Sequence, residues 1–361
     1  MPTNNTTTTN NQQQEKWGYG VLYGRKWQIL IYKPAYKKNE ETGEKERDPE
    51  HDTEINVSEL KCSFKCTYVN NTIMTVGTLV VYNMNVETEA SVINEAFQIS
   101  ISGGYEYGQY GEIFTGDIVQ VIRNRENGID YRLEIIAISG FHRLQLNHCR
   151  ASIAAQSDVR QQVKAICQNS EIPIKTGELS ENVSKQPLPR GKILFGKPFK
   201  YLRDIGIANN AYFKLNSKEE VEMHFMYDTI PEDKALYLTP ESGLVGTPKY
   251  SDNGIIIKML LDARVKVGTM IKIDNSLIQR QAMSIDTKMS AMDGKGSKKP
   301  PQADNSQNQT KMFDQDGEYM ALSVTHSGDT WGDDWSTEVV GLSRTANLPD
   351  AVRRGDQSMQ A

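Results

Sequence analysis

Short runs of alternating apolar and polar residues, separated by turn-forming residues, recur along most of this 361-residue chain. Such runs predict β-strands, and Asn70-Asn71 and Asn127-Gly128 are typical of the turns between them. This density of short strands favours a β-sandwich or a β-barrel. After a strand pair or one long bent strand at 21–32, strands are predicted at 63–69, 78–83, 96–103, 113–123, 131–139, 255–260, 270–273, 319–326 and 335–342.

The middle of the chain has a different pattern. Residues 157–158 predict a helix N-cap, and apolar residues follow at helical spacing as far as Ile166. A Pro/Gly-rich loop is predicted at 187–196, and Pro198 marks the start of a second helix. A hairpin is predicted from 211–215 and 221–227. We therefore expect a small α/β module inserted between two strand-rich units.

These patterns predict the domain organisation of the chain. The polar run at 286–311 is expected to be a long loop or an element that orders on assembly, and the charged run at 37–52 an exposed loop. The predicted units are a disordered tail at 1–16, a first β-domain at 17–148, an α/β module at 149–235, a second β-domain at 236–345 and a C-terminal tail at 346–361.

Composition restricts the classes of function. The formal net charge of -5 provides no general basic field for holding nucleic acid. No apolar run approaches the roughly 20 residues that span a bilayer, and the N-terminal MPTNNTTTTNNQQQ lacks the apolar core of a secretory signal. The four cysteines show no disulfide-framework spacing, which favours a reducing cytoplasm.

Three short motifs invite a chemical interpretation, and each has a simpler one. Gly191 to Lys197 has P-loop spacing, but Pro198 stands where the magnesium-binding hydroxyl belongs. Cys62 and Cys66 lie about 13 Å apart along a predicted strand, too far to share one tetrahedral ion. The glycines at 103–111 do not form a dinucleotide fingerprint and are typical of a bulge or tight turn.

Residues 317–342, GEYMALSVTHSGDTWGDDWSTEVVGL, contain the densest group of potentially catalytic side chains: His326, Asp329, Asp333 and Asp334. The group matches neither the HExxH zinc pattern nor an EF-hand loop. Two Gly-Asp pairs sit between alternating runs, and Asp and His can bond the free amides of a tight turn. We therefore predict a polar hairpin turn rather than a metal or acid/base site.

Four segments, in this order, carry a family resemblance. The first, FQISISGGYEYGQYGEIFTGDIVQVIRNRENGIDYRLEIIAISG, is followed by the α/β module, then by SGLVGTPKYSDNGIIIKMLLDARVKVGTMIKI, and last by the segment at 319–342. Together they resemble the central baseplate hub proteins of contractile-tailed bacteriophages, which are related in fold to the N-terminal part of type VI secretion spike proteins. Ser102 and Asp262-Ala263 depart from the usual family residues without disturbing the fold assignment.

The resemblance implies a mainly β fold with an α+β insert. Two tube-type β-barrel or β-sandwich domains flank the α/β module, and three chains form a pseudo-sixfold ring. It implies structural roles for a set of motif positions and no catalytic, cofactor-binding or metal-binding residue. These positions are Gly104, Tyr105, Ile113, Phe114, Gly116, Gly128, Asp130, Gly243, Leu244, Gly246, Pro248, Leu260, Leu261, Gly268, His326, Gly328, Asp329 and Trp335.

The partners implied are the chain itself as a homotrimer, the tail tube protein and the central spike protein, with tape measure and baseplate wedge proteins as further contacts. Such a hub adapts a hexameric tube to a trimeric spike, and DNA passes through its channel without specific binding. The implied location is the virion tail, assembled in the bacterial host cytoplasm. On this interpretation, His326→Ala affects folding or ring assembly before any turnover.

Two other classes of function stay open at this point. One is a tail-associated cell-wall or metal-dependent hydrolase that uses the His326 and Asp cluster. The other is a carbohydrate-binding β-sandwich, because aromatic rings can form a sugar platform, although the tryptophans are dispersed in the sequence. They are Trp17, Trp27, Trp331 and Trp335.

Overall fold

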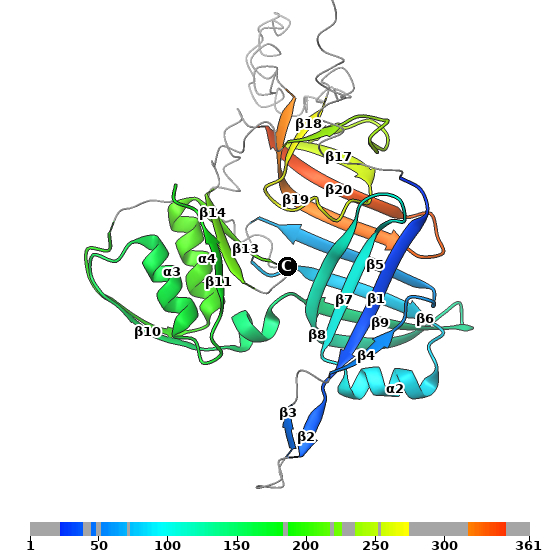
Figure 1. Ribbon diagram of the computed structural model, residues 1–361, viewed down its shortest axis with the longest axis horizontal. Coiled ribbons are helices and arrows are strands. Elements are labelled where there is room, and N and C mark those ends of the chain that lie inside the picture. The colour runs from blue at the N-terminus through cyan, green and yellow to red at the C-terminus, as the bar shows by residue number, and fades with distance from the viewer. Residues whose placement is uncertain are drawn as a thin grey trace, which may run out of the picture.

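Most of the described strands belong to one large sheet (Figure 1). The computed structural model describes residues 22–38, 45–47, 52–70, 73–182, 187–216, 220–225, 235–251, 254–273 and 317–343. Within these ranges, 13 strands form the large sheet, and the remaining strands form three smaller sheets. The prediction of a mainly β fold with helices in an insert is confirmed.

The large sheet runs without a break from strands of the C-terminal part to strands of the N-terminal part. A side branch consists of β15 (Leu236–Leu238) and β18 (Met270–Ile273). β15 pairs with β18, and β18 pairs with β19 (Glu318–Asp329) of the main sheet. The main order is β16 (Lys249–Ser251), β17 (Gly254–Leu260), β20 (Trp335–Ser343), β19 (Glu318–Asp329), β5 (Cys62–Val69), β6 (Val76–Tyr82), β9 (Asp130–Ile138), β8 (Tyr110–Glu126), β7 (Gln98–Tyr105), β1 (Arg25–Lys33) and β4 (Thr53–Asn56).

Local sequence explains the strand ends. Asn127 and Gly128 both have positive φ, 50° and 75°, and form the centre of the tight turn between β8 and β9, which a hydrogen bond from Ile129 N to Glu126 O closes at 3.1 Å. Gly104, with φ 156°, ends β7 where a Cβ would lie 2.1 Å from the carbonyl oxygen of Gln109. The glycine there allows two stretches of backbone to approach closely.

The insert between β9 and β15 forms a separate lobe beside the large sheet (Figure 1). We call it the insert lobe. Asp158 caps α3 (Val159–Gln168) by accepting a hydrogen bond from Gln161 N at 2.7 Å, and Asp158 N donates to Gln161 Oε1 at 3.0 Å, which completes a capping box. The lobe contains a π-helical turn (Phe141–Leu146), β10 (Cys149–Ile153), α3 (Val159–Gln168), β11 (Thr176–Leu179), β12 (Lys192–Gly196), α4 (Pro198–Asn209), β13 (Ala211–Leu215) and β14 (Val221–Phe225).

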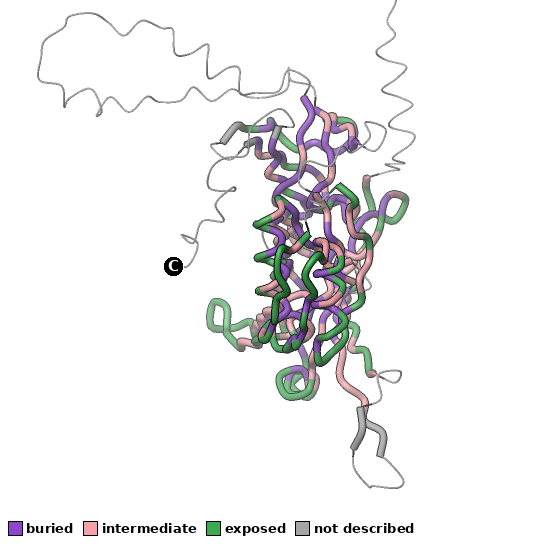
Figure 2. Tube along the Cα trace, turned by 90° about the vertical axis from the view of Figure 1, so that its left-hand side faces the viewer, coloured by how far each residue is buried: buried purple, intermediate pink, exposed green. Residues whose placement is uncertain are grey.

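Three groups of buried apolar residues make up the core. One lies under the N-terminal strands, one inside the insert lobe and one under the C-terminal strands. The groups are not confined to consecutive sequence, since Leu261 and Trp335 join the N-terminal group and Tyr212 of the lobe joins the C-terminal group. Purple, buried segments run along the middle of the molecule in Figure 2. The boundaries at 148/149 and 235/236 stay a prediction.

The structure differs from the sequence-based expectation in several places. Residues 192–196 form a strand, not a loop, because Ile193-Leu194-Phe195 pairs with β10. Within the charged run at 37–52, β2 (Tyr36–Lys38) pairs with β3 (Lys45–Arg47). A helix that was not predicted, α2 (Val86–Glu95), follows β6. The polar loop at 286–311 and the tails at 1–16 and 346–361 lie outside the described residues.

Candidate functional site at the β5–β19 seam

The N-terminal and C-terminal strands meet where β5 pairs antiparallel with β19. We call this pairing, over residues 63–69 and 323–329, the seam. Both of its ends are closed by further hydrogen bonds. At one end, Cys62 N donates to Thr330 Oγ1 at 2.9 Å and Thr330 N donates to Cys62 O at 2.9 Å. At the other, Asn70 N donates to Leu322 O at 3.0 Å. The seam therefore fixes two distant parts of the chain as one sheet.

His326 lies inside the seam, on strand β19, which confirms the strand predicted at 319–326 and shows that His326 is not part of the polar turn predicted for the cluster. Its side chain is 1% exposed. Strand alternation explains the position, because Val324, two residues earlier, also points into the core. The imidazole packs edge-on against the ring of Tyr68, with 5.9 Å between ring centroids.

A buried polar network satisfies His326. Its Nδ1 lies 2.9 Å from Thr337 Oγ1, and that oxygen also accepts a hydrogen bond from Asp262 N at 3.1 Å. Asp262 is buried and is held by Arg264, with one contact of 3.0 Å from Nε and one of 2.8 Å from NH2. Burial lowers the pKa of His326 to about 4, although the Asp262 carboxylate and a backbone hydrogen bond with Val265 oppose that shift.

This histidine, hydroxyl and carboxylate are buried side by side, but the arrangement is not an accessible catalytic centre. Thr337 is 0% exposed and Asp262 is 2% exposed, so a substrate cannot reach the hydroxyl in this conformation. The network instead joins β19, β20 and the segment after β17. In the sequence, Asp262 stands out only as a departure from the usual family residues, and Thr337 does not stand out. The alternation of β20 from the buried Trp335 was the available signal.

The three aspartates of the predicted cluster do not converge on His326. Asp329 Oδ1 accepts hydrogen bonds from Trp331 N at 2.9 Å and Gly332 N at 2.8 Å, and this confirms the prediction that Asp329 supports a hairpin turn. Asp334 Oδ1 accepts from Ser336 Oγ at 2.9 Å. Among the described residues, no group of three or more His, Cys, Asp or Glu side chains is placed to hold a metal ion.

Several motif positions meet under the seam. Ile113, Leu261 and Trp335 pack around Gly103, where an added Cβ would lie 2.8, 3.2 and 3.4 Å from them, respectively. Gln109 donates to the carbonyl of Leu261, which also connects the two segments. Tyr105, Phe114 and Leu261 are buried in the same N-terminal core as Trp335. The first, third and fourth resemblance segments thus come together, although they are far apart in sequence.

The other motif positions are dispersed. Gly116 lies on β8, while Gly128 and Asp130 lie at the far end of the β8–β9 hairpin. Gly268 precedes β18 and contacts Tyr212 of the insert lobe. Leu244 bridges to Met259 on β17. Gly243, Gly246 and Pro248 lie in the stretch before β16, Leu260 ends β17, and Gly328 lies on β19. Their structural roles, which the family resemblance implies, remain a prediction.

Cys62 and Cys66 both point into the core from β5, as the strand interpretation predicts. Burial raises the pKa of both thiols, that of Cys62 to about 12. Of the tryptophans, Trp27 and Trp335 lie with ring centroids 5.9 Å apart, but Trp335 is buried, so the pair does not form a surface platform for a sugar. Trp331 is exposed, and Trp17 lies outside the described residues.

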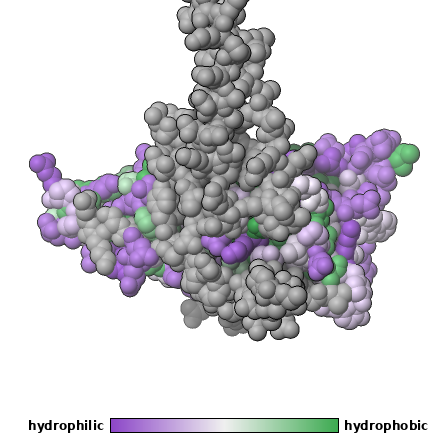
Figure 3. Space-filling model, turned by 90° about the horizontal axis from the view of Figure 1, so that it is seen from above, coloured by the Kyte–Doolittle hydropathy of each residue, from purple (hydrophilic) through white to green (hydrophobic). Residues whose placement is uncertain are grey.

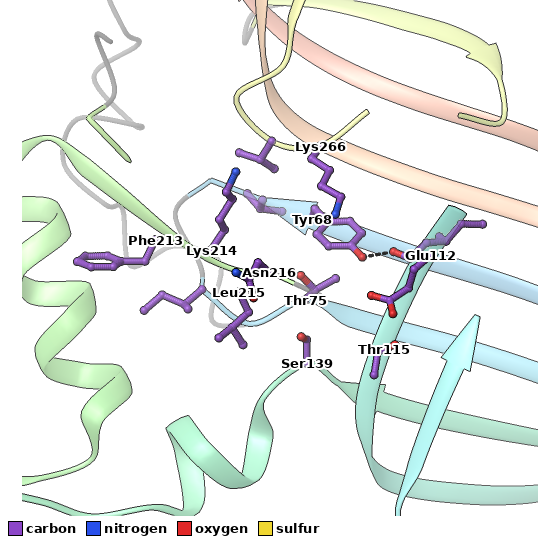
Figure 4. Close-up of a pocket in the computed structure, with 14 residues that line it drawn as sticks. Tyr68, Thr75, Glu112, Thr115, Ser139, Phe213, Lys214, Leu215, Asn216 and Lys266 are labelled. Atoms are coloured by element: carbon purple, nitrogen blue, oxygen red, sulfur yellow. Dashed lines mark hydrogen bonds between the residues drawn. The ribbon is translucent and has the colours of Figure 1, made fainter. Parts of the chain in front are cut away.

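A cavity of about 60 Å³ lies where the insert lobe meets the two strand-rich parts (Figure 4). Lys214 and Asn216 line it from the end of β13, Glu112 and Thr115 line it from β8, and Lys266 lines it from the segment before β18. The volume has room for a few water molecules with polar partners on several sides. The cavity thus lies at the junction between the insert lobe and the large sheet.

The sequence and the fold were compared with known proteins. No protein-family profile and no curated protein sequence matches the chain. Among solved structures, the prophage MuSo2 43 kDa tail protein from Shewanella oneidensis matches with a TM-score of 0.50 and 7% identity, over 88% of this chain and 98% of that one. A tail protein from Neisseria meningitidis MC58 matches with a TM-score of 0.50 and 10% identity, over 91% and 98% of the two chains.

A chain of the Francisella PdpA–VgrG complex, in its half-lidded form, also has a TM-score of 0.50, with 12% identity. That match covers 94% of this chain and 62% of the larger one. No helix in the described ranges is long and apolar enough to cross a membrane. The resemblance to tail proteins expected from four sequence segments is therefore confirmed at the level of structure, and the chain has a phage tail protein fold.

Proposed function

We propose that this protein is a structural hub of a contractile phage tail baseplate. Three copies form a ring that joins the hexameric tail tube to the trimeric central spike and encloses part of the DNA channel. The tail tube and spike proteins are its main partners, with tape measure and baseplate wedge proteins as further contacts. The protein acts in the virion and is assembled in the host cytoplasm. The tail protein fold supports this proposal.

The observation that carries the proposal is the seam. It makes one continuous sheet from both strand-rich parts, and this sheet ends in β4 on one side and β16 on the other. Within the described ranges, neither end strand has a second neighbour in the sheet. Unpaired edges at two different ends suit head-to-tail contacts, which form a closed ring when the rotation between copies is one third of a turn.

Glu54 on β4 has the geometry that such an edge needs. Val57 N donates to Ile29 O at 3.0 Å, so Val57 and, two residues earlier, Ile55 direct their backbone groups toward β1. The alternate residue, Glu54, therefore directs its N–H toward the open side of the strand. A strand from a neighbouring copy can accept this hydrogen bond.

The buried network supports a structural role over the alternative hydrolase. His326 is enclosed by strands, and its partner hydroxyl has no exposed surface. A hydrolase would need a reachable nucleophile or water at this point. Peptidoglycan hydrolysis that disappears in a folded His326→Ala variant would reverse this ranking.

Light scattering and native mass spectrometry test the proposed ring. We expect a mass three times that of one chain, alone or on addition of the spike protein. Glu54→Pro removes the outward N–H and should shift the species toward monomer, whereas Glu54→Ala keeps that N–H and should still assemble. A strictly monomeric wild type at every concentration, with and without spike and tube proteins, would overturn the proposal.

A further inference from the structure

Strand β12 forms another open edge, besides those of β4 and β16, in a part of the molecule far from the seam. Among the described strands it pairs with β10 alone, and we call this two-stranded sheet the ribbon. Figure 1 places β10 at the outer margin of the insert lobe, away from the large sheet. Figure 2 views the lobe from that side and shows exposed segments in front of the buried core. The ribbon is therefore available to another molecule.

The exposed face of the ribbon carries two large apolar side chains. Ile193 is 86% exposed and Phe195 is 71% exposed, whereas Leu194 between them is buried in the core of the lobe. Their cross-strand partners are Ser152 and Arg150. Seen from above, the described surface in view is mostly hydrophilic with small apolar patches (Figure 3). Among the exposed large apolar side chains of the described residues, Ile193 is the most exposed, and Phe195 lies on the same face of the strand two residues later.

The backbone of β12 is also open. Phe195 N donates to the hydroxyl of Tyr201 at 3.0 Å, so this N–H points away from β10. Residues two apart in a strand direct their backbone groups to the same side. The N–H and C=O of Ile193 therefore point to the open edge, where they have no partner among the described residues. An exposed edge of this kind is a template for strand addition.

The charge around β12 restricts what can bind there. Arg190, Lys192 and Lys197 are exposed, and none has an acidic partner in the described part of the chain. Arg150, on the neighbouring strand β10, does have an acidic partner, since it pairs with Glu171 at 3.1 Å. The whole chain has a net charge of -5, so this basic strand contrasts with the rest of the protein.

We propose that the open edge of β12 binds an extended, acidic segment of a partner protein by strand addition. Backbone hydrogen bonds to Ile193 give affinity, and apolar side chains of the segment pack on Ile193 and Phe195. Acidic side chains of the segment pair with the flanking Arg190, Lys192 and Lys197. This site is separate from the edges proposed for the ring and does not depend on ring formation.

Fluorescence anisotropy tests the site with a labelled synthetic peptide in which Glu alternates with Val. The full-length wild type should bind this peptide, and the matched peptide with Lys in place of Glu should bind more weakly. Raising NaCl from about 0.05 M to about 0.5 M should weaken binding of the acidic peptide, because salt screens exposed charges.

Two variants at one position separate the backbone from the side chain. Ile193→Pro removes the outward N–H and should weaken binding at least about tenfold, equivalent to about 1.4 kcal/mol. Ile193→Thr keeps that N–H and the β-branched shape, and should bind within about threefold of wild type, because Thr, like Ile, is favoured in strands. Circular dichroism of both variants confirms that the fold is intact.

Three results would overturn the proposal. The first is equal binding of the acidic and basic peptides, and the second is unchanged binding by a folded Ile193→Pro variant. The third is self-association of the wild type that is abolished by Ile193→Pro, because the open edge of β12 would then bind a second copy of this chain and not a partner protein. A wild type that binds the acidic peptide as a monomer would sustain this site while contradicting the proposed ring.

Discussion

The seam and the ribbon are both antiparallel strand pairs, yet they differ in what covers their edges. In the seam, β19 has β20 on one side and β5 on the other. In the ribbon, β12 has β10 on one side and no strand on the other within the described residues. Both edges have the same hydrogen-bonding capacity, so occupancy of the edge decides whether a strand holds the fold or remains available for a partner.

The side chains follow the same division. In the seam, polar residues such as His326 and Thr337 are buried and matched to partners within the chain. In the ribbon, apolar residues such as Ile193 and Phe195 are exposed. From residue type alone, we would expect the polar residues to be exposed and the apolar residues to be buried. The comparison indicates that the seam serves stability and the ribbon serves recognition.

Proline substitutions should give the largest difference in the free energy of unfolding between the seam and the ribbon. Thr325 on β19 pairs with Thr67 on one side and Glu338 on the other, so Thr325→Pro removes a ladder hydrogen bond wherever its N–H points. We expect it to lower the free energy of unfolding by roughly 3 kcal/mol or more. Ile193→Pro at the open edge should lower it by about 0.5 kcal/mol or less.

Urea denaturation followed by circular dichroism measures both values. Equal losses in the two variants would show that the edge of β12 is already paired in the isolated protein, and the comparison would then fail. Val324→Ala, in the same strand as Thr325, is a control that removes buried apolar surface but leaves the ladder intact.

The second prediction concerns the pH dependence of the seam. Because the pKa of His326 is lowered to about 4, the unfolded chain binds a proton near pH 6.5 while the folded protein does not. Stability that is present above pH 6.5 is therefore lost as the pH falls toward 4, by roughly 3 kcal/mol from this residue. His326→Gln should flatten that part of the profile.

The measurement is the free energy of unfolding of wild type and His326→Gln at several pH values between about 4 and 7. The difference in slope isolates His326 from the carboxylates that titrate in both proteins. Parallel profiles for wild type and His326→Gln would contradict the buried position of His326.

The third prediction compares glycines in the two regions. At Gly328 in the seam, an added Cβ would lie 2.6 Å from the ring of Phe64 and 2.8 Å from that of Trp335. Both rings are buried, so Gly328→Ala should cost about 1–3 kcal/mol by overpacking. At Gly191 beside the ribbon, the nearest atom would be Ile153 O at 3.2 Å, and Gly191→Ala should cost less.

Thermal unfolding of the two alanine variants tests this difference. A Gly328→Ala variant as stable as wild type would mean that the rings move aside and that the seam is loosely packed. A Gly191→Ala variant that is the less stable of the two would reverse the comparison.

Sequence alone predicted those elements whose pattern is local. Strand β18 was predicted at Met270–Ile273, and β5 and β9 within one residue of their ends, because side-chain alternation is visible in short windows. The cap of α3 followed from Asp158. Helix α2 was missed because its β-branched residues obscure the helical pattern, although Asn85, which caps it, was a local signal.

The seam could not be predicted in this way. It joins β5 to β19 across most of the sequence, and nothing local specifies which edges pair. His326 ends the strand predicted at 319–326, but its residue type and its neighbouring aspartates also suggested a polar turn. Its position two residues after Val324, on the same face of the strand, was the stronger signal for a buried strand residue. Strand β12 was hidden by the flanking Gly191 and Gly196.

The smallest expected effect is on stability, at the exposed face of the ribbon. Phe195 is 71% exposed, and the guanidinium of Arg150 lies 5.6 Å from its ring centroid. Phe195→Thr should therefore change the free energy of unfolding by about 0.5 kcal/mol or less, which urea denaturation measures. The same variant should weaken binding of the acidic peptide. If Phe195→Thr instead destabilised the fold by more than about 1 kcal/mol, the ring would be part of the packing of the lobe. A small loss of stability with a clear loss of binding would separate the two regions, because an aromatic residue that the fold does not need is then kept at the surface for a partner.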